Sequence, residues 1–377
     1  MAVSKVVTQL LKRLWPIAVV LLAACGPEAS PAVTATSAAS ASSPTPAGSL
    51  PPHCKLPLIE SYSLGGFLVF PEGTYTADPL SYETYDFATK NLRTAPEPAF
   101  HGPQDYSMNQ PVFDARSSRW VPVARTAVSP DGSRYVYSQY QYPSNASATS
   151  LPAPTGSLIR VVAIATGEDR VIYQGPPYDV VGWTPEGIYL RRVCTDADCR
   201  SGGGLWSLDP GGGVPQQAAA PPAQVSGINS VPMWNALGGG ATWALRADPA
   251  NGSGSRLLRH DLNDGQETTW LSRPQSSWMS ILGINAGLPI LAISENSSTG
   301  VWLVTGRDAA RLLITMPIIQ TNGPGGDQLV PATPRGAPIQ DRYGLWLGTD
   351  GGVFLQTADG AVRRVSDRSG AVAGPCT

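Results

Sequence analysis

The chain has 377 residues, a formal net charge of −2 and an isoelectric point near 5.9. This balance gives no electrostatic basis for binding nucleic acid. Charged residues make up 14% of the sequence, against about 25% in an average domain, and the 40 glycines and 36 prolines argue against long helices. The composition therefore favours a chain built from strands.

The first 24 residues have the pattern of an export signal. A basic segment, 5–13, precedes the apolar run 14–24, which is too short to cross about 30 Å of hydrocarbon. The run ends in Leu-Ala-Ala-Cys-Gly at 22–26, which resembles the lipobox of bacterial lipoproteins. This resemblance implies that the thiol of Cys25 is diacylated and anchors the protein to the extracytoplasmic face of a bacterial membrane. A plain secretory signal is the alternative.

Residues 25–52 form a tract composed almost wholly of Ala, Ser, Thr, Pro and Gly. Such a tract buries too little apolar surface to offset the entropy lost on ordering, so we expect a disordered tether. The tether would hold a folded domain, residues 53–377, away from the bilayer. That domain is longer than one hydrophobic core usually supports, which predicts internal repeats.

The clearest structural signal is a pair of alternating runs around the turn Ser129-Pro-Asp-Gly132. Pro130 presets φ, Asp131 can accept a hydrogen bond from the backbone two residues on, and Gly132 tolerates positive φ. The pattern predicts a tight β-hairpin over 125–138. Weaker copies of this turn lie at 184–187, 235–240, 285–289 and 348–352.

A second class of turn follows in each unit, at 87–90, 164–168, 208–212, 262–266 and 305–308. Two turns in each unit of about 55 residues indicate four strands per unit. The hairpin at 125–138 resembles the Ser-Pro-Asp-Gly hairpin of TolB-type, WD-repeat-like β-propellers. The resemblance implies an all-β propeller fold for 53–377, and we expect six blades, with seven as the alternative. The expected blades are 56–105, 113–176, 177–222, 223–274, 275–318 and 325–377.

Four cysteines remain besides Cys25, an even number that fits an oxidising compartment. Cys194 and Cys199 enclose only four residues, whereas Cys54 and Cys376 lie at opposite ends of a domain that a closed ring would bring together. We expect the pairs 194–199 and 54–376. A zinc site is the rival, but the Cys-x4-Cys spacing has no histidine pair nearby.

The last unit offers too few residues after Gly352 for a fourth strand. Many propellers close by letting an N-terminal strand complete the last blade. We therefore expect residues 55–59 or 67–70 to supply that strand.

No catalytic motif stands out in the sequence. The three histidines are not paired at metal-ligand spacing, and neither a Gly-x-Ser-x-Gly elbow nor a phosphate-binding loop occurs. Turn chemistry accounts for the aspartates that precede glycines. Together with the propeller resemblance, these observations favour a monomeric, non-catalytic module without a cofactor that binds a protein or a cell-envelope ligand.

Binding is expected on the face opposite the tight turns, because that face carries the long segments 140–158, 194–204, 248–255 and 316–340. Residues at the starts of the inner strands would ring the axial opening: Arg125, Asp179, Asn229, Trp278 and Asp341. Trp278 is the candidate for stacking on a sugar or a peptide. The alternative function is a lactonase- or glycosidase-like propeller hydrolase, in which Asp179, Asn229 and Asp341 could hold a calcium ion through oxygen ligands.

Overall fold

The structure is a computed structural model of the chain in two units, 1–45 and 46–377. All described residues belong to the second unit: 53–61, 64–79, 84–86, 91–93, 111–142, 154–193, 204–222, 233–247, 255–273, 278–295, 298–323 and 326–377. The expected signal, Cys25, the tether, Cys194, Cys199 and Asn229 lie outside them. None of the helical segments in these ranges has the length and apolar character needed to cross a membrane.

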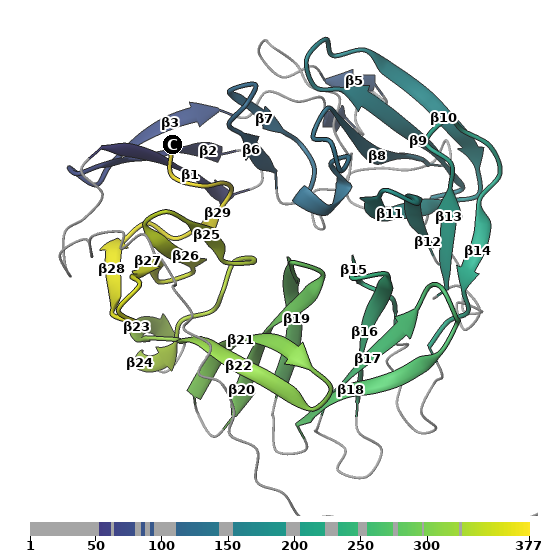
Figure 1. Cartoon of the computed structure of the whole chain (residues 1–377). Helices are drawn as coiled ribbons and strands as arrows, with labels where there is room; N and C mark the ends of the chain where they lie inside the picture. Colours follow the sequence, from purple (N-terminus) through teal and green to yellow (C-terminus); the bar gives the residue numbers. More distant parts are fainter. Residues whose placement is uncertain are drawn as a thin grey trace, which may run out of the picture. The chain divides into compact units, whose positions relative to one another are not determined.

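The described strands form antiparallel sheets that follow one another along the chain (Figure 1). The first sheet contains β1 (Cys54–Ser61), β2 (Leu64–Phe70), β3 (Thr74–Pro79) and β29 (Ala371–Val372). The second contains β8 (Arg134–Gln141), β9 (Gly156–Ala163) and β10 (Asp169–Gly175), after the short 3-10 helix η2 (Arg125–Ala127). The third contains β11 (Tyr178–Thr184), β12 (Gly187–Arg192), β13 (Leu205–Leu208) and β14 (Gln216–Ala219).

Three further sheets have four strands each, in chain order. The fourth contains β15 (Ala236–Gly238), β16 (Ala241–Ala247), β17 (Ser255–Asp261) and β18 (Glu267–Arg273). The fifth contains β19 (Trp278–Asn285), β20 (Leu288–Glu295), β21 (Ser298–Gly306) and β22 (Ala309–Thr315). The sixth contains β25 (Ile339–Asp341), β26 (Gly344–Thr349), β27 (Gly352–Gln356) and β28 (Val362–Ser366). Two-stranded hairpins are formed by β4 (Thr84–Asp86) with β5 (Asn91–Arg93), β6 (Val112–Asp114) with β7 (Arg119–Val121), and β23 (Ile318–Gly323) with β24 (Gly326–Pro331).

The inner strands of neighbouring sheets approach one another closely at glycines. A Cβ added to Gly182 in β11 would lie 3.2 Å from the carbonyl oxygen of Thr126 in η2 and 3.2 Å from Cδ1 of Leu237 in β15. In the next pair of sheets, a Cβ on Gly239 would lie 2.8 Å from the carbonyl oxygen of Gly287. These contacts connect η2, β11, β15 and the turn after β19 in chain order, and Figure 1 shows β11, β15 and β19 one after another.

The C-terminal segment joins the last sheet to the first. Gly348 in β26 packs against the backbone at Gly370, just before β29. Beyond β29, the carbonyl oxygen of Ala373 accepts hydrogen bonds from the backbone N–H of Phe113, at 3.1 Å, and from Nη2 of Arg125, at 3.4 Å. The C-terminal segment therefore contacts both the last sheet and the segment before the second sheet, and the ring of sheets is closed. The fold is a β-propeller, and its blade number stays a prediction.

The two classes of turn lie where the sequence predicts them in four successive sheets. A turn of the first class precedes β8, and turns of this class join β11 to β12, β15 to β16, and β19 to β20. Turns of the second class join the two outer strands of the same sheets. Gly132 has φ +71°, as the predicted turn requires. The first arm of the hairpin predicted over 125–138 is wrong, however, because Arg125–Ala127 forms the 3-10 helix η2 and only Val128 makes a bridge, to Tyr135. The turn predicted at 87–90 lies outside the described residues.

In the last sheet the expected assignment of the turn is wrong. Residues 348–352 join β26 to β27, whereas the inner turn runs through Asp341-Arg-Tyr-Gly344. The reason is that a tight glycine-containing turn such as 348–352 has no local feature that distinguishes an inner turn from a turn between the second and third strands. The last sheet therefore has its own four strands.

The expected source of the closing strand is also wrong. Residues 55–59 and 67–70 belong to β1 and β2 of the first sheet, and β29 pairs with β1 through Leu58 and Val372. The C-terminal strand thus completes the first sheet, because the last sheet already has four strands. The expected disulfide between Cys54 and Cys376 is confirmed.

Candidate functional site

Asp179 lies at the second position of β11, near the start of an inner strand as predicted. Its Oδ2 forms an ion pair with Nη2 of Arg191 at 3.1 Å. Nη1 of the same guanidinium donates a 2.8 Å hydrogen bond to Oδ1 of Asn235, just before β15. Arg191 is only 8% exposed, so this network links the third and fourth sheets in a largely buried setting. Reasoning from the sequence missed Arg191, because an arginine in a strand is usually solvated.

Arg125 lies in η2 and donates its hydrogen bond to the carbonyl oxygen of Ala373. Burial lowers the pKa of its guanidinium, and the nearby Asp114 carboxylate opposes that effect. The side chain therefore contacts the segment that closes the ring.

Trp278 is the first residue of β19 and its side chain is 43% exposed. Its exposure is compatible with the predicted stacking role, which stays a prediction. Asp341, by contrast, is the last residue of β25 and lies at the inner turn. Its Oδ2 accepts hydrogen bonds from Nε1 of Trp346 at 2.7 Å and from the backbone N–H of Cys376 at 2.9 Å.

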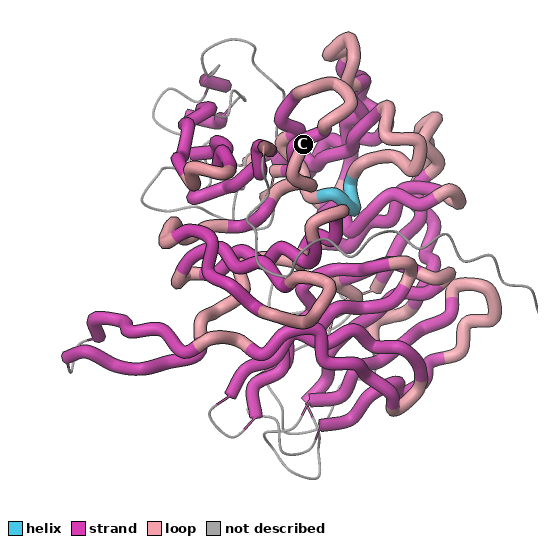
Figure 2. Tube along the Cα trace, turned by 60° about the vertical axis from the view of Figure 1, so that its left-hand side comes forward, coloured by secondary structure: helices cyan, strands magenta, loops and turns pink. Residues whose placement is uncertain are grey.

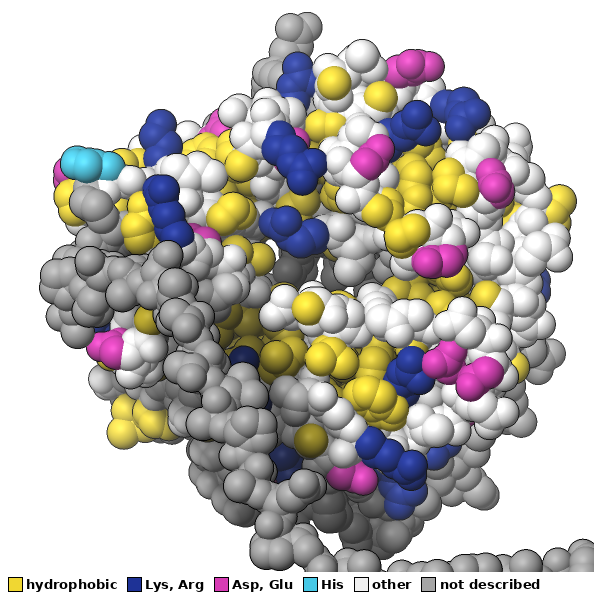
Figure 3. Space-filling view, in the orientation of Figure 1, with side chains coloured by type: hydrophobic (Ala, Val, Ile, Leu, Met, Phe, Trp, Pro, Cys, Tyr) yellow, Lys and Arg dark blue, Asp and Glu magenta, His cyan; other side chains and the backbone are white. Residues whose placement is uncertain are grey.

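The described members of the predicted axial set differ in position, and Arg125 lies in the 3-10 helix η2 rather than at the start of an inner strand. Asp179 and Trp278 begin inner strands, Asp341 ends one, and Asn229 lies outside the described residues. Across the described ranges no group of three or more His, Cys, Asp or Glu side chains is arranged to hold a metal ion. Figure 3 shows acidic and basic side chains interspersed on the face in view, with hydrophobic side chains between them.

The segment 316–340, predicted to be a long irregular connection, contains the hairpin of β23 and β24. Figure 2 shows this hairpin projecting from the rest of the sheets, on the left-hand side of the view. It lies at the same height as the β23 and β24 labels in Figure 1, because the two views differ only by a turn about the vertical axis. Near its base, Ile319 pairs with Val330 and packs against a core cluster shared by β20 to β22 and Leu347 of β26. Two of its other side chains face solvent: Ile318 is 55% exposed and Leu329 is 76% exposed.

A pocket of about 710 Å³ lies beside the base of this hairpin, and we call it the rim pocket. Its lining comes from the end of β22, from β23, from the turn between β26 and β27, and from β27 and β28. Because β22 and β28 are the last strands in their sheets, the pocket lies at the outer rim between the fifth and sixth sheets. Its volume is in the range of sites that bind small molecules or side chains.

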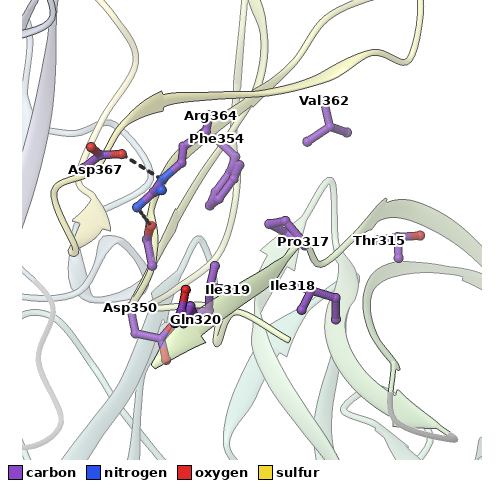
Figure 4. Close-up of a pocket in the computed structure, with 11 residues that line it drawn as sticks. Thr315, Pro317, Ile318, Ile319, Gln320, Asp350, Phe354, Val362, Arg364 and Asp367 are labelled. Carbon is purple, nitrogen blue, oxygen red and sulfur yellow. Dashed lines mark hydrogen bonds and ion pairs between the residues drawn. The ribbon is translucent and has the colours of Figure 1, made fainter. Parts of the chain in front are cut away.

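The two ends of the rim pocket differ in chemistry (Figure 4). Pro317, Ile318 and Val362 lie toward one end, and Arg364 and Asp367 lie toward the other. Nε of Arg364 pairs with Oδ1 of Asp367 at 3.1 Å, and its Nη2 donates to the carbonyl oxygen of Gly351 at 2.5 Å. The arginine therefore has partners within the pocket itself.

Asp350 is the second carboxylate of the polar end. Its Oδ1 accepts a 2.7 Å hydrogen bond from the backbone N–H of Thr333, which fixes the side chain. In the described part of the chain it forms no ion pair. One guanidinium and two carboxylates leave the polar end with a formal charge of −1.

No protein-family model matches this chain, and neither does any curated protein. Similar solved structures include TolB from Acinetobacter baumannii, with 12% identity and a TM-score of 0.40, covering 87% of this chain and 68% of TolB. An oligogalacturonate lyase from Vibrio parahaemolyticus has 12% identity and a TM-score of 0.40, covering 82% of this chain and 89% of the lyase. An acylaminoacyl peptidase from Pyrococcus horikoshii has 11% identity and a TM-score of 0.46, covering 81% of this chain and 48% of the peptidase. These likenesses concern the fold alone.

The rim pocket was missed by reasoning from the sequence. Its apolar side chains have the pattern of ordinary strand residues, and its two walls are about thirty to fifty residues apart in the chain. The one available signal was the length of segment 316–340, which was selected as a candidate binding loop.

Proposed function

We propose that the protein is an extracytoplasmic β-propeller, anchored to a bacterial membrane through Cys25, that binds a protein or a cell-envelope ligand without catalysing a reaction. The export pattern of residues 1–24 and the Leu-Ala-Ala-Cys-Gly sequence at 22–26 support the location. The Ala/Ser/Thr/Pro-rich tract that follows supports a tethered domain.

The observation that carries the binding role is the pairing of a projecting hairpin with a pocket at its base. The hairpin of β23 and β24 exposes Ile318 and Leu329, large apolar side chains that soluble surfaces usually present singly. The rim pocket beside it combines an apolar end with a charged end. Pockets that bind ligands are typically apolar with a few well-placed polar groups.

The polar groups of the candidate sites favour binding over catalysis. Arg191 and Asp179 are paired with each other, and Arg364 is paired with Asp367.

A thermal-shift screen tests this proposal. The full chain, in detergent, is screened against short peptides, peptidoglycan fragments, oligosaccharides and calcium, and in parallel for turnover of lactones and aryl glycosides. The proposal predicts a raised melting temperature with a peptide or an envelope fragment, and no turnover. Hydrolysis of a lactone or a glycoside would contradict it, as would the absence of any shift with peptides and envelope fragments.

A further inference from the structure

We infer that the rim pocket binds an extended segment of a partner protein in which a lysine or arginine side chain lies next to an apolar one. The inference rests on the proposed function, because it names the site and the partner chemistry of the binding module.

The apolar end of the pocket suits a branched or aromatic side chain. Phe354 is buried at 3% exposure, whereas Ile318 and Val362 are 55% and 40% exposed and line the same cavity. Covering such surface is favourable because it removes apolar area from water. A ligand with an apolar group therefore gains most at this end.

The charged end favours a cation. Arg364 already pairs with Asp367 and donates to the carbonyl oxygen of Gly351, so its positive charge is largely compensated within the pocket. Asp350 is held by the N–H of Thr333 through Oδ1, which leaves Oδ2 to accept from a ligand. An ammonium or guanidinium group would complete the charge balance of this end, whereas a carboxylate would meet a formal charge of −1.

The hairpin indicates that this group belongs to a protein segment rather than to a free amine. Leu329 lies directly across from Gln320, a residue of the pocket lining, and is 76% exposed. The apolar surface thus continues from the cavity onto β24. A small amine would fill the cavity and leave Leu329 in water, but an extended segment can cover both.

A positional-scanning library of fluorescein-labelled acetyl-hexapeptides tests the inference. Binding to the full chain in detergent is measured by fluorescence polarisation, with heptylamine as a competitor that carries the same chemistry without a backbone. The inference predicts selection of lysine or arginine next to leucine, isoleucine, valine or phenylalanine. It also predicts that binding weakens as salt concentration rises.

Matched variants locate the binding. Asp350→Asn keeps the acceptor for Thr333 but removes the charge, and we expect about tenfold weaker binding of basic peptides. Asp359→Asn, in an exposed turn, is the control and should leave binding unchanged. Val362→Arg should weaken binding by at least about tenfold. The control is Val214→Arg, which should not weaken binding, because Val214 is 76% exposed and lies between β13 and β14 of the third sheet.

Several results would overturn the inference. These are selection of acidic residues, equal effects of Asp350→Asn and Asp359→Asn, competition by heptylamine as effective as by the best peptide, or no peptide binding at all. If envelope fragments raise the melting temperature while no hexapeptide binds, the inference fails and the proposed function stands. If neither class of ligand binds, both fail.

Discussion

Replacing Asp341 by alanine is expected to loosen the closure of the propeller. Its Oδ1 accepts a hydrogen bond from the backbone N–H of Tyr343 at 2.8 Å, and its Oδ2 accepts from Nε1 of Trp346 and from the backbone N–H of Cys376. Cys376 belongs to the C-terminal segment that completes the first sheet, and Asp341 belongs to the last sheet. One carboxylate therefore connects the two sheets where the ring closes.

The size of the effect follows from the burial of the donors. Trp346 is fully buried and Cys376 is 5% exposed, so water reaches their N–H groups poorly once the carboxylate is gone. A buried donor left without a partner costs about 1–3 kcal/mol. Two such donors, partly relieved by local relaxation, give an expected loss of roughly 2–4 kcal/mol for Asp341→Ala. Asp341→Asn retains one acceptor oxygen and should lose less.

The assay is equilibrium urea unfolding of the full chain at pH 7 without reductant, followed by tryptophan fluorescence. Asp359→Ala is the matched control, because Asp359 also accepts two hydrogen bonds in a turn, from Thr357 Oγ1 and from the N–H of Ala361, but is exposed. Equal free energies of unfolding for the two alanine variants would refute the reasoning.

Three further predictions concern single residues. Gly132→Val should destabilise the fold by about 1–3 kcal/mol more than Ser133→Val, because φ at Gly132 is +71° and a new Cβ would lie 2.7 Å from Nη1 of Arg116; equal melting temperatures would count against this. The pKa of Asp131 is lowered from 3.8 to about 2, chiefly by the hydroxyl of Ser129 and the backbone N–H of Ser133, so its stabilising effect is present above pH 3.8 and is lost as pH falls through about 2. In urea unfolding, the free energy of unfolding of the wild type should therefore exceed that of Asp131→Asn at pH 6, and the difference should shrink toward pH 2. A difference that does not depend on pH would refute this prediction. Cys25→Ser should move the protein from the membrane fraction to the soluble extracytoplasmic fraction and abolish labelling by palmitate, whereas continued labelling would exclude Cys25 as the anchor.

The tight turns were predictable from the sequence because their chemistry is local. Ser129-Pro-Asp-Gly132 fixes φ at two positions and supplies a side-chain acceptor, so it forms a turn whatever the rest of the chain does. The same reasoning located the turns of the next three sheets and, through their spacing, the four-stranded repeat.

The position of a turn within a sheet was not predictable in the same way. Gly348 to Gly352 forms a tight turn, but nothing local distinguishes an inner turn from one between the second and third strands. The error shifted the last sheet by one strand. It placed Asp341 at the start of an inner strand and left that sheet one strand short. An N-terminal strand was therefore expected to complete the last sheet, whereas the C-terminal strand β29 completes the first.

Among the long-range features, the disulfide was predictable from the sequence and the rim pocket was not. Cys54 and Cys376 could be paired because ring closure brings the ends of a domain together, whichever end supplies the strand. The rim pocket depends on how Ile318 and Val362 from adjacent sheets face one another, and side-chain packing between sheets leaves no periodic signal in the sequence.

The central claim is that ligands bind at the rim between the fifth and sixth sheets rather than at the axis. Hydrogen exchange of the full chain, measured by mass spectrometry with and without the tightest-binding hexapeptide, tests it most directly. The account predicts slower exchange in 317–331 and 349–367, and unchanged exchange at the inner-strand starts 178–181 and 278–281. Slower exchange confined to those inner-strand starts would contradict it.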